Sequence, residues 1–204
     1  MLGGFGHLSS RDVRSSKKFI SGLKPKISGT SLVLDVGAGI GRVSHDLLLT
    51  IFDKVSMLEC TPSFIEQAKL LLPADRIEDI FPVTMQNFTA AEKDFGRYDM
   101  VWIQWVIIYA NDEGLVKFFN ECRKLLKPEG LICIKDNVIL PTTPKEDVED
   151  IILDKEDCSI TRSERYLLQL TEQAGLQLLA REIQPKFPKE LFPVVMYAFQ
   201  MSDQ

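Results

Sequence analysis

Leu34-Asp-Val-Gly-Ala-Gly-Ile-Gly-Arg42 is the stretch of the sequence that decides the fold. An apolar run leads into it, and apolar residues recur at helical spacing after it. Glycine has no Cβ, so it can adopt positive φ and let a ligand approach the backbone. The pattern predicts a strand, a tight turn and a helix whose first N–H groups are free to bind a ligand. A plain strand-to-helix turn that simply needs glycine is the alternative.

The spacing of the glycines argues against a dinucleotide. The dinucleotide fingerprint is G-x-G-x-x-G, but here the third glycine comes one place early and Arg42 stands where that fingerprint requires glycine. A second apolar run, residues 55–58, ends in Glu59, whose carboxylate is well placed to accept hydrogen bonds from ribose hydroxyls. G-x-G-x-G followed by an acid at a strand end resembles the S-adenosylmethionine (SAM) site of class I methyltransferases.

Length and composition indicate one globular domain spanning residues 1–204. We find no apolar run of the roughly 18–20 residues that a membrane span needs, so we expect no membrane partner. A net charge of −5 does not favour binding to the nucleic-acid backbone and is compatible with a basic partner. The two histidines, and four cysteines without C-x-x-C spacing, predict no metal site and a reducing compartment.

Strands and helices alternate along most of the chain, which predicts a doubly wound, mostly parallel α/β sheet with helices on both faces. Seven strands are expected in this Rossmann-like sheet, at residues 31–34, 54–59, 79–85, 98–105, 131–135, 176–182 and 194–200. Residues 1–25 are expected to form an N-terminal helical segment, with Ser9 or Ser10 as the helix cap. Further helices are expected at residues 43–51, 61–72, 112–126 and 163–174. Residues 138–158 are expected to form an irregular, acidic insertion.

Polar and aromatic residues follow several of the predicted strands. In a parallel sheet the carboxyl ends of the strands meet at one edge, where ligands bind. Packing alternatives remain open for two of these residues: Trp105 as a core tryptophan on a central strand, and Asn137 as a turn former. The residues expected to share this edge are Gly37–Gly41, Glu59, Met85–Gln86, Gln104–Trp105 and Asp136–Asn137.

The insertion carries seven carboxylates within twelve positions, residues 146–157. Such a charge run is often only a solvated face, whereas a functional reading is attraction of a cationic substrate. The apolar triplet Ile151-Ile-Leu153 interrupts the run and suggests that this segment packs against the protein. It therefore favours a binding role for the two acids that follow, Asp154 and Asp157.

Four motifs together resemble the eukaryotic protein N-terminal methyltransferases. They are Met1-Leu-Gly-Gly-Phe-Gly-His-Leu-Ser-Ser10, Leu34–Arg42, Ile103-Gln-Trp-Val-Ile107 and Ile134-Lys-Asp-Asn137. Members of this family use SAM to methylate the α-amine of proteins that begin Xaa-Pro-Lys or Xaa-Pro-Arg. The resemblance covers nearly the whole chain and implies a monomeric enzyme of the cytoplasm and nucleus.

The resemblance also implies which residues form the site. Seven would bind the cofactor: Gly37, Gly39, Arg42, Glu59, Met85, Gln86 and Gln104. Five would bind the basic N-terminus: Trp105, Asn137, Asp154, Asp157 and Ser159. Asp157 is the position proposed in the family as a base, and Asn137 would hold the substrate backbone. The family usually carries aspartate in place of Glu59, so the carboxylate is kept.

Two departures from the family pattern bear on catalysis. Tyr109 stands where the family has a histidine thought to assist deprotonation, and a phenol with a pKa near 10 is a poor base at neutral pH. Relatives also carry an N-terminal extension with aromatic residues over the active site, which we expect this chain to lack because it begins at the Met1 motif. Two alternatives therefore stay open: a small-molecule methyltransferase of the same class, and a weak or inactive binder of basic N-termini.

Overall fold

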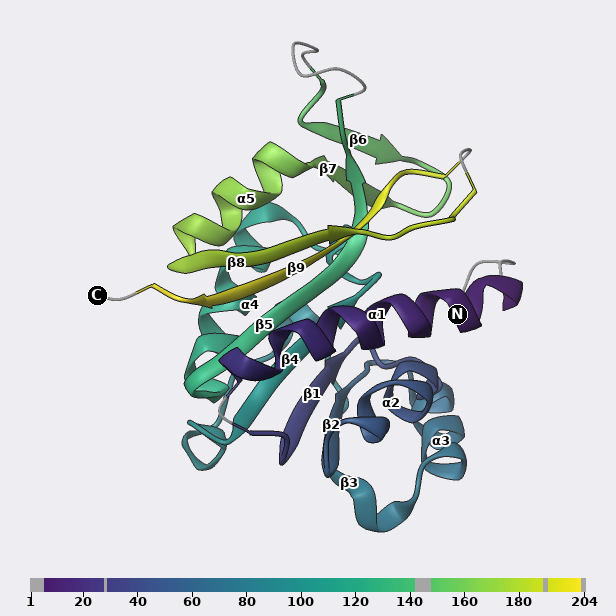
Figure 1. The fold of residues 1–204 in the computed structure, drawn as a ribbon, viewed down its shortest axis with the longest axis vertical. Coiled ribbons are helices and arrows are strands. Elements are labelled where there is room, and N and C mark those ends of the chain that lie inside the picture. The colour runs from purple at the N-terminus through teal and green to yellow at the C-terminus, as the bar shows by residue number, and fades with distance from the viewer. Residues whose placement is uncertain (1–5, 28, 142–147, 189–190, 203–204) are drawn as a thin grey trace.

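The computed structural model describes residues 6–27, 29–141, 148–188 and 191–202, which form a central sheet between two layers of helices (Figure 1). The strands run in the spatial order β3-β2-β1-β4-β5, all parallel, and β9 then pairs antiparallel with both β5 and β8. The strands are β1 (Leu32–Val36), β2 (Lys54–Leu58), β3 (Ile77–Phe81), β4 (Tyr98–Gln104), β5 (Leu126–Ile139), β6 (Ile151–Asp154), β7 (Ser159–Ser163), β8 (Leu176–Ile183) and β9 (Val194–Met201). The predicted mostly parallel, doubly wound sheet is confirmed.

The strand count was wrong, because the described part of the chain has nine strands where seven were predicted. The two additional strands form a hairpin within and after the predicted irregular insertion. The apolar triplet lies on β6 and pairs antiparallel with β7, while β7 pairs with the carboxyl end of β5 through Val138↔Arg162. Glu146 and Asp147 lie outside the described residues.

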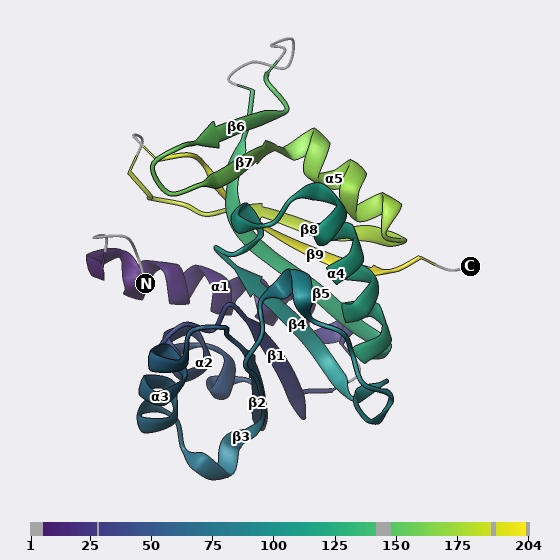
Figure 2. The same ribbon diagram turned by 180° about the vertical axis from the view of Figure 1, so that it is seen from behind.

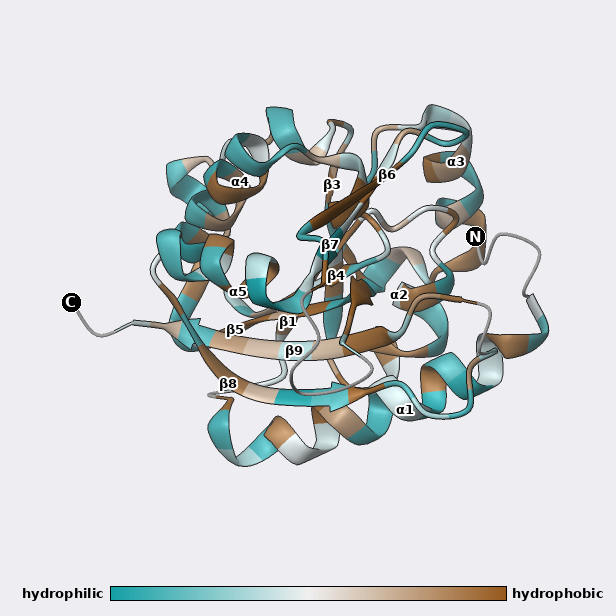
Figure 3. Cartoon of the chain, turned by 90° about the horizontal axis from the view of Figure 1, so that it is seen from above, coloured by the Kyte–Doolittle hydropathy of each residue, from teal (hydrophilic) through white to brown (hydrophobic). Residues whose placement is uncertain are grey.

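Helices cover both faces of the sheet (Figures 1 and 2). Seen from above, α1 lies on one side of the strands and α4 and α5 lie on the other (Figure 3). The helices are α1 (Ser9–Leu23), α2 (Arg42–Asp46), α3 (Pro62–Leu71), α4 (Asp112–Leu125) and α5 (Glu164–Gln173). Single 3₁₀ turns are η1 (Gly6–Leu8), η2 (Lys24–Lys26), η3 (Leu48–Thr50), η4 (Ala74–Arg76), η5 (Met85–Asn87), η6 (Glu92–Asp94) and η7 (Ile107–Tyr109).

Each face of the sheet has its own hydrophobic core. Phe118 and Phe119 of α4 are buried in one core, whereas Phe19 and Ile20 of α1 are buried in the other. Strand β4 is buried along its whole length between the two. Burial of such side chains contributes roughly 1.5–3 kcal/mol each, so these two cores hold the helices on the sheet. Across the described residues, no helix has the length and hydropathy needed to cross a membrane.

Three local predictions were wrong. In place of one helix at residues 43–51, the structure has the short helix α2, which ends at Asp46, and then the 3₁₀ turn η3. The N-cap of α1 is Leu8 rather than Ser9 or Ser10, and the hydroxyl of Ser9 instead accepts a hydrogen bond from Arg42. Strand β3 ends at Phe81, so Met85 lies in the following 3₁₀ turn rather than on the predicted strand.

Candidate functional site

The glycine turn joins β1 to α2 as predicted. Gly37 and Gly39 have φ of 69° and 57°, a conformation that other residues adopt only with strain. The Gly37 N–H donates to the carbonyl oxygen of Leu58 at 2.8 Å, which ties the turn to the end of β2. The turn therefore sits where two strands end side by side.

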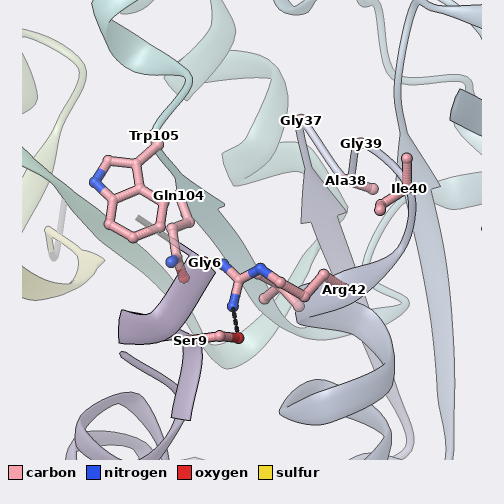
Figure 4. Close-up of a pocket in the computed structure, with 10 residues that line it drawn as sticks. Gly6, Ser9, Gly37, Ala38, Gly39, Ile40, Arg42, Gln104 and Trp105 are labelled. Carbon is pink, nitrogen blue, oxygen red and sulfur yellow. Dashed lines mark hydrogen bonds between the residues drawn. The ribbon is translucent and has the colours of Figure 1, made fainter. Parts of the chain in front are cut away.

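A cavity of about 250 Å³ opens beside this turn (Figure 4). A Cβ added to Gly39 would meet no protein atom closer than 4.0 Å, so the space beside this glycine is empty. Ten residues line the cavity: Gly6, Ser9, Gly37, Ala38, Gly39, Ile40, Arg42, Val43, Gln104 and Trp105. Four predicted cofactor residues, Gly37, Gly39, Arg42 and Gln104, thus share one cavity.

Glu59 lies immediately after β2 and is oriented by backbone donors. Its two carboxylate oxygens accept hydrogen bonds from the N–H of Gly39 at 2.9 Å and of Thr61 at 2.8 Å. A carboxylate has about four lone-pair positions, so each oxygen can accept one further hydrogen bond. Glu59 is therefore fixed against the glycine turn with acceptor capacity left for hydroxyl groups.

The other two predicted cofactor residues, Met85 and Gln86, do not line the first cavity. Met85 is buried in the core of the sheet face that α4 covers. Gln86 does not appear among the residues that line the cavity, and its amide nitrogen donates to the backbone oxygen of Tyr109 at 2.7 Å. Through this contact Gln86 supports the loop that follows β4.

Trp105 lines the first cavity rather than a separate substrate pocket. It has a φ of 51°, which is unusual for a bulky residue, and its N–H donates to the carbonyl oxygen of Lys135 at 3.1 Å. This backbone conformation turns the chain sharply at the end of β4, next to Gln104 (Figure 4).

A second cavity, of about 320 Å³, lies at the β6–β7 hairpin. It brings together four of the five residues predicted to bind a basic N-terminus, since Asn137, Asp154, Asp157 and Ser159 all line it. The remaining lining residues are Ile108, Ile152, Leu153, Lys155, Thr161 and Phe192. The cavity therefore combines carboxylates with apolar walls.

The two carboxylates of this cavity are held by the hairpin turn itself. One oxygen of Asp154 accepts from the N–H of Glu156 at 2.8 Å, and one oxygen of Asp157 accepts from the N–H of Ser159 at 2.9 Å. Each contact orients its side chain, and within the part of the chain that the structure describes the second oxygen of each carboxylate accepts no hydrogen bond and is available to a cation.

Tyr109 lies in η7 with its side chain 52% exposed. Partial burial raises its pKa above 10, and the nearby carboxylates of Asp157 and Asp136 raise it further. The phenol is therefore neutral at physiological pH and can exchange hydrogen bonds but not act as a base, in agreement with the sequence-based expectation.

Arg162 of β7 organises the loop that carries Tyr109, and no sequence motif points to this role. The guanidinium is 2% exposed and donates to the carbonyl oxygens of Ile107 at 3.2 Å and Ala110 at 2.6 Å. It also pairs with Asp112 at the start of α4, at 2.7 Å. Strand β7 is thereby joined to the loop after β4.

Asp136 is a buried acid beneath the same loop. Burial raises its pKa to about 7, although the N–H groups of Asn137 and Ile107 donate to it. Through these two backbone N–H groups, Asp136 orients both Ile107, at the start of η7, and Asn137, which lines the second cavity.

The first cavity fits SAM by the chemistry of its donors. Arg42, which lines the cavity, would supply a cation for the cofactor carboxylate, and Glu59, held against Gly39 at the edge of the glycine turn, would supply acceptors for ribose hydroxyls. The empty space beside Gly39 allows close approach to the backbone. The residues present thus suit the carboxylate and the ribose of that cofactor, neither of which requires a phosphate site.

Comparisons with known proteins agree with this fit. The chain is 41% identical to the Alpha N-terminal protein methyltransferase 1 of Dictyostelium discoideum, over 98% of this chain and 73% of that protein. It is 40% identical to the N-terminal Xaa-Pro-Lys N-methyltransferase 1 of Homo sapiens, over 98% and 87% of the two chains.

Solved structures give the same result. A SAM-dependent methyltransferase from Leishmania major superposes with a TM-score of 0.87 at 34% identity, covering 98% of this chain and 75% of that one. The glycopeptide N-methyltransferase MtfA, solved with SAM, shares the fold with a TM-score of 0.67 at 16% identity, over 93% of this chain and 87% of its own. The family model described as AdoMet-dependent proline di-methyltransferase matches residues 1–200. The chain therefore belongs to the AdoMet-dependent proline di-methyltransferase family and is a SAM-dependent methyltransferase.

Proposed function

We propose that the chain methylates the α-amino group of proteins that begin Xaa-Pro-Lys or Xaa-Pro-Arg. The observation that carries the proposal is the second cavity, where Asp154 and Asp157 each keep a free carboxylate oxygen beside Asn137. A basic third residue matches these acids, and a neutral small substrate has no need of them. The relatives named for Xaa-Pro-Lys N-termini support the same substrate.

The proposed reaction uses two groups of residues. When bound, SAM would supply an electrophilic methyl group on a sulfonium sulfur, and the neutral α-nitrogen would accept this methyl group while the sulfur keeps the electron pair of the sulfur–carbon bond as a thioether. Asn137 orients the substrate backbone and Asp154 receives the basic side chain. Asp157 accepts the proton of the α-ammonium, directly or through water, before transfer. The pKa of an α-amine is about 7.7–8.0, so little assistance is required.

A methylation assay tests this proposal. Wild-type protein with SAM and a Ser-Pro-Lys peptide should yield products heavier in steps of about 14 Da by mass spectrometry, and a Ser-Pro-Glu peptide should not. Asp157→Asn should lower turnover by about 100-fold or more, as expected for loss of a positioned base. Asp75→Asn, an exposed residue in η4, is the matched control and should keep the wild-type rate. Near-normal turnover in Asp157→Asn would remove both proposed roles of this carboxylate.

A catalytically weak binder of basic N-termini is the second candidate. It is favoured by Tyr109, which is neutral and offers no base where the family carries histidine. Calorimetry separates the candidates, because a binder retains peptide affinity without product formation. Methylation of small amines in preference to Pro-Lys peptides would instead identify a small-molecule methyltransferase.

We further propose that the enzyme acts as a monomer in the cytoplasm and nucleus on protein N-termini. The net charge of −5 supports a basic partner over nucleic acid. Light scattering of the purified protein and imaging of a tagged form in cells test the two proposals separately.

A further inference from the structure

Asp12 of α1 is the centre of a buried polar cluster beneath the first cavity. Its carboxylate accepts hydrogen bonds from Arg42 Nη1 at 2.9 Å and from Gln104 Nε2 at 3.1 Å to each oxygen. The side chain is 1% exposed and does not appear among the residues that line the cavity. Asp12 thus binds Arg42 and Gln104, which line the first cavity, but does not line this cavity itself.

A buried lysine holds Asp12 in place. Lys135 of β5 is fully buried, and its ammonium group donates to a carboxylate oxygen of Asp12 at 2.5 Å. It also donates to Ser16 Oγ at 2.9 Å and to Gln184 Oε1 at 2.8 Å. Burial lowers the pKa of Lys135, and the charge of Asp12 opposes this shift. These contacts fix α1 to the sheet at the height of the cavity.

Hydrogen bonds hold the side chains of both cavity residues, Gln104 and Arg42, in the observed orientation. Gln104 Oε1 accepts from the indole N–H of Trp102 at 3.0 Å while its nitrogen is bound to Asp12, so neither end of the amide is free to rotate. Arg42 uses Nη1 for Asp12 and for Ser9 at 3.2 Å (Figure 4). A guanidinium has five N–H donors in a planar fork, so its remaining donors stay available for an anion.

We propose that Asp12 is a positioning residue for cofactor binding, through which α1 orients the side chains of Arg42 and Gln104 toward SAM. This role depends on the cofactor and not on the identity of the methyl acceptor. A failure of the Xaa-Pro-Lys proposal would therefore leave it unaffected. The expected consequence is that the Asp12 carboxylate contributes to SAM affinity through Arg42.

The test compares variants that differ only in this carboxylate. Asp12→Asn alone strands the buried Lys135 charge and can unfold the protein, so Lys135→Met serves as the background. Affinity for S-adenosylhomocysteine is measured by calorimetry, with circular dichroism and Tm as checks of folding. Adding Asp12→Asn to Lys135→Met should weaken affinity about tenfold or more, the range for a hydrogen bond to a charged group. Equal affinity in these two variants would overturn the proposal.

A coupling measurement distinguishes positioning from general stability. In an Arg42→Ala, Lys135→Met background, Asp12→Asn should change the affinity for S-adenosylhomocysteine less than about threefold, because its main partner is already absent. If the tenfold loss persists without Arg42, Asp12 does not act through Arg42 and the proposed route is wrong.

Discussion

Tyr109 is the residue at which the chemistry of this chain departs most from its family pattern. Because its pKa lies above 10, we expect Tyr109→Phe to change turnover of a Ser-Pro-Lys peptide less than about threefold at pH 7.5. Tyr109→His should raise turnover, since imidazole has a pKa near 6.5 and can accept a proton at this pH. Initial rates between pH 6.5 and 9 measure both effects.

The contrast between these two variants decides the role of the phenol. A loss of about 100-fold or more in Tyr109→Phe would show that the hydroxyl is needed, and an unchanged rate in Tyr109→His would leave deprotonation to Asp157 alone. Peptide affinity measured by calorimetry controls for altered binding.

At this scale, the family resemblance implied five substrate residues, and four of them, Asn137, Asp154, Asp157 and Ser159, line one cavity. The fifth, Trp105, lines the first cavity instead. Asp12 and Arg162 were missed, because each lies in an ordinary amphipathic segment and acquires its role only from partners tens of residues away. The structure shows that both charged side chains are buried, whereas the spacing of apolar residues along the sequence does not indicate this burial.

The β6–β7 hairpin and the loop after β4 are joined as elements by Arg162. Arg162→Met removes the donors to two carbonyl groups and to Asp112, which leaves buried acceptors without partners. We expect a loss of about 2–4 kcal/mol in the free energy of unfolding and a raised KM for peptide, with little change in affinity for S-adenosylhomocysteine. Urea unfolding, peptide kinetics and calorimetry supply the three measurements.

Arg165→Met is the matched control for this prediction, since Arg165 is an exposed arginine close by on α5. It should affect stability and peptide KM much less. A variant of Arg162 with wild-type peptide KM would show that the loop keeps its conformation without the guanidinium.

The hairpin is also the element that the sequence described least well. Its strands are short, and β7 pairs with β5 across more than twenty residues of chain, so no local pattern indicates the pairing. The glycine turn, by contrast, was predicted correctly because its conformation depends on the glycines themselves. Local chemistry decides such turns, whereas strand pairing between distant segments depends on the whole fold.

The whole molecule should respond to pH through its buried acids. Burial raises the pKa of Asp35 from 3.8 to about 7. The folded state therefore binds a proton more tightly than the unfolded state, and this group's contribution to stability falls as pH rises from about 4 to 7. Asp35→Asn should remove this dependence, worth at most about 4 kcal/mol by the size of the shift.

Urea unfolding of both proteins at pH 5.0 and 7.5 measures the effect. The wild type should lose more stability than Asp35→Asn over this interval. Asp99, whose pKa is lowered mainly by Lys127 and Ser31 against the opposing effect of burial, loses its contribution only toward lower pH and does not mimic this behaviour. Equal pH dependence in the two proteins would show that Asp35 is already charged at pH 5.

At the scale of the molecule, the layered sheet was predictable from the alternation of strands and helices. The full length of β5 was not, since this strand begins at Leu126 and continues past the expected end at residue 135 to Ile139. Hydrophobic patterning gives the interior of a strand, whereas its final residues depend on what pairs with them.

The length of β5 has a consequence for how specificity can change. Lys135 anchors the cofactor side and Asn137 lines the substrate side, only two residues further along the same strand. Since a strand rises about 3.3 Å per residue, the spacing between donor and acceptor sites is set by rigid backbone. Substitutions at Lys155, Glu156 or Cys158 of the hairpin turn can therefore retarget the enzyme to new N-termini while Asp157 is kept and the transfer distance stays constant.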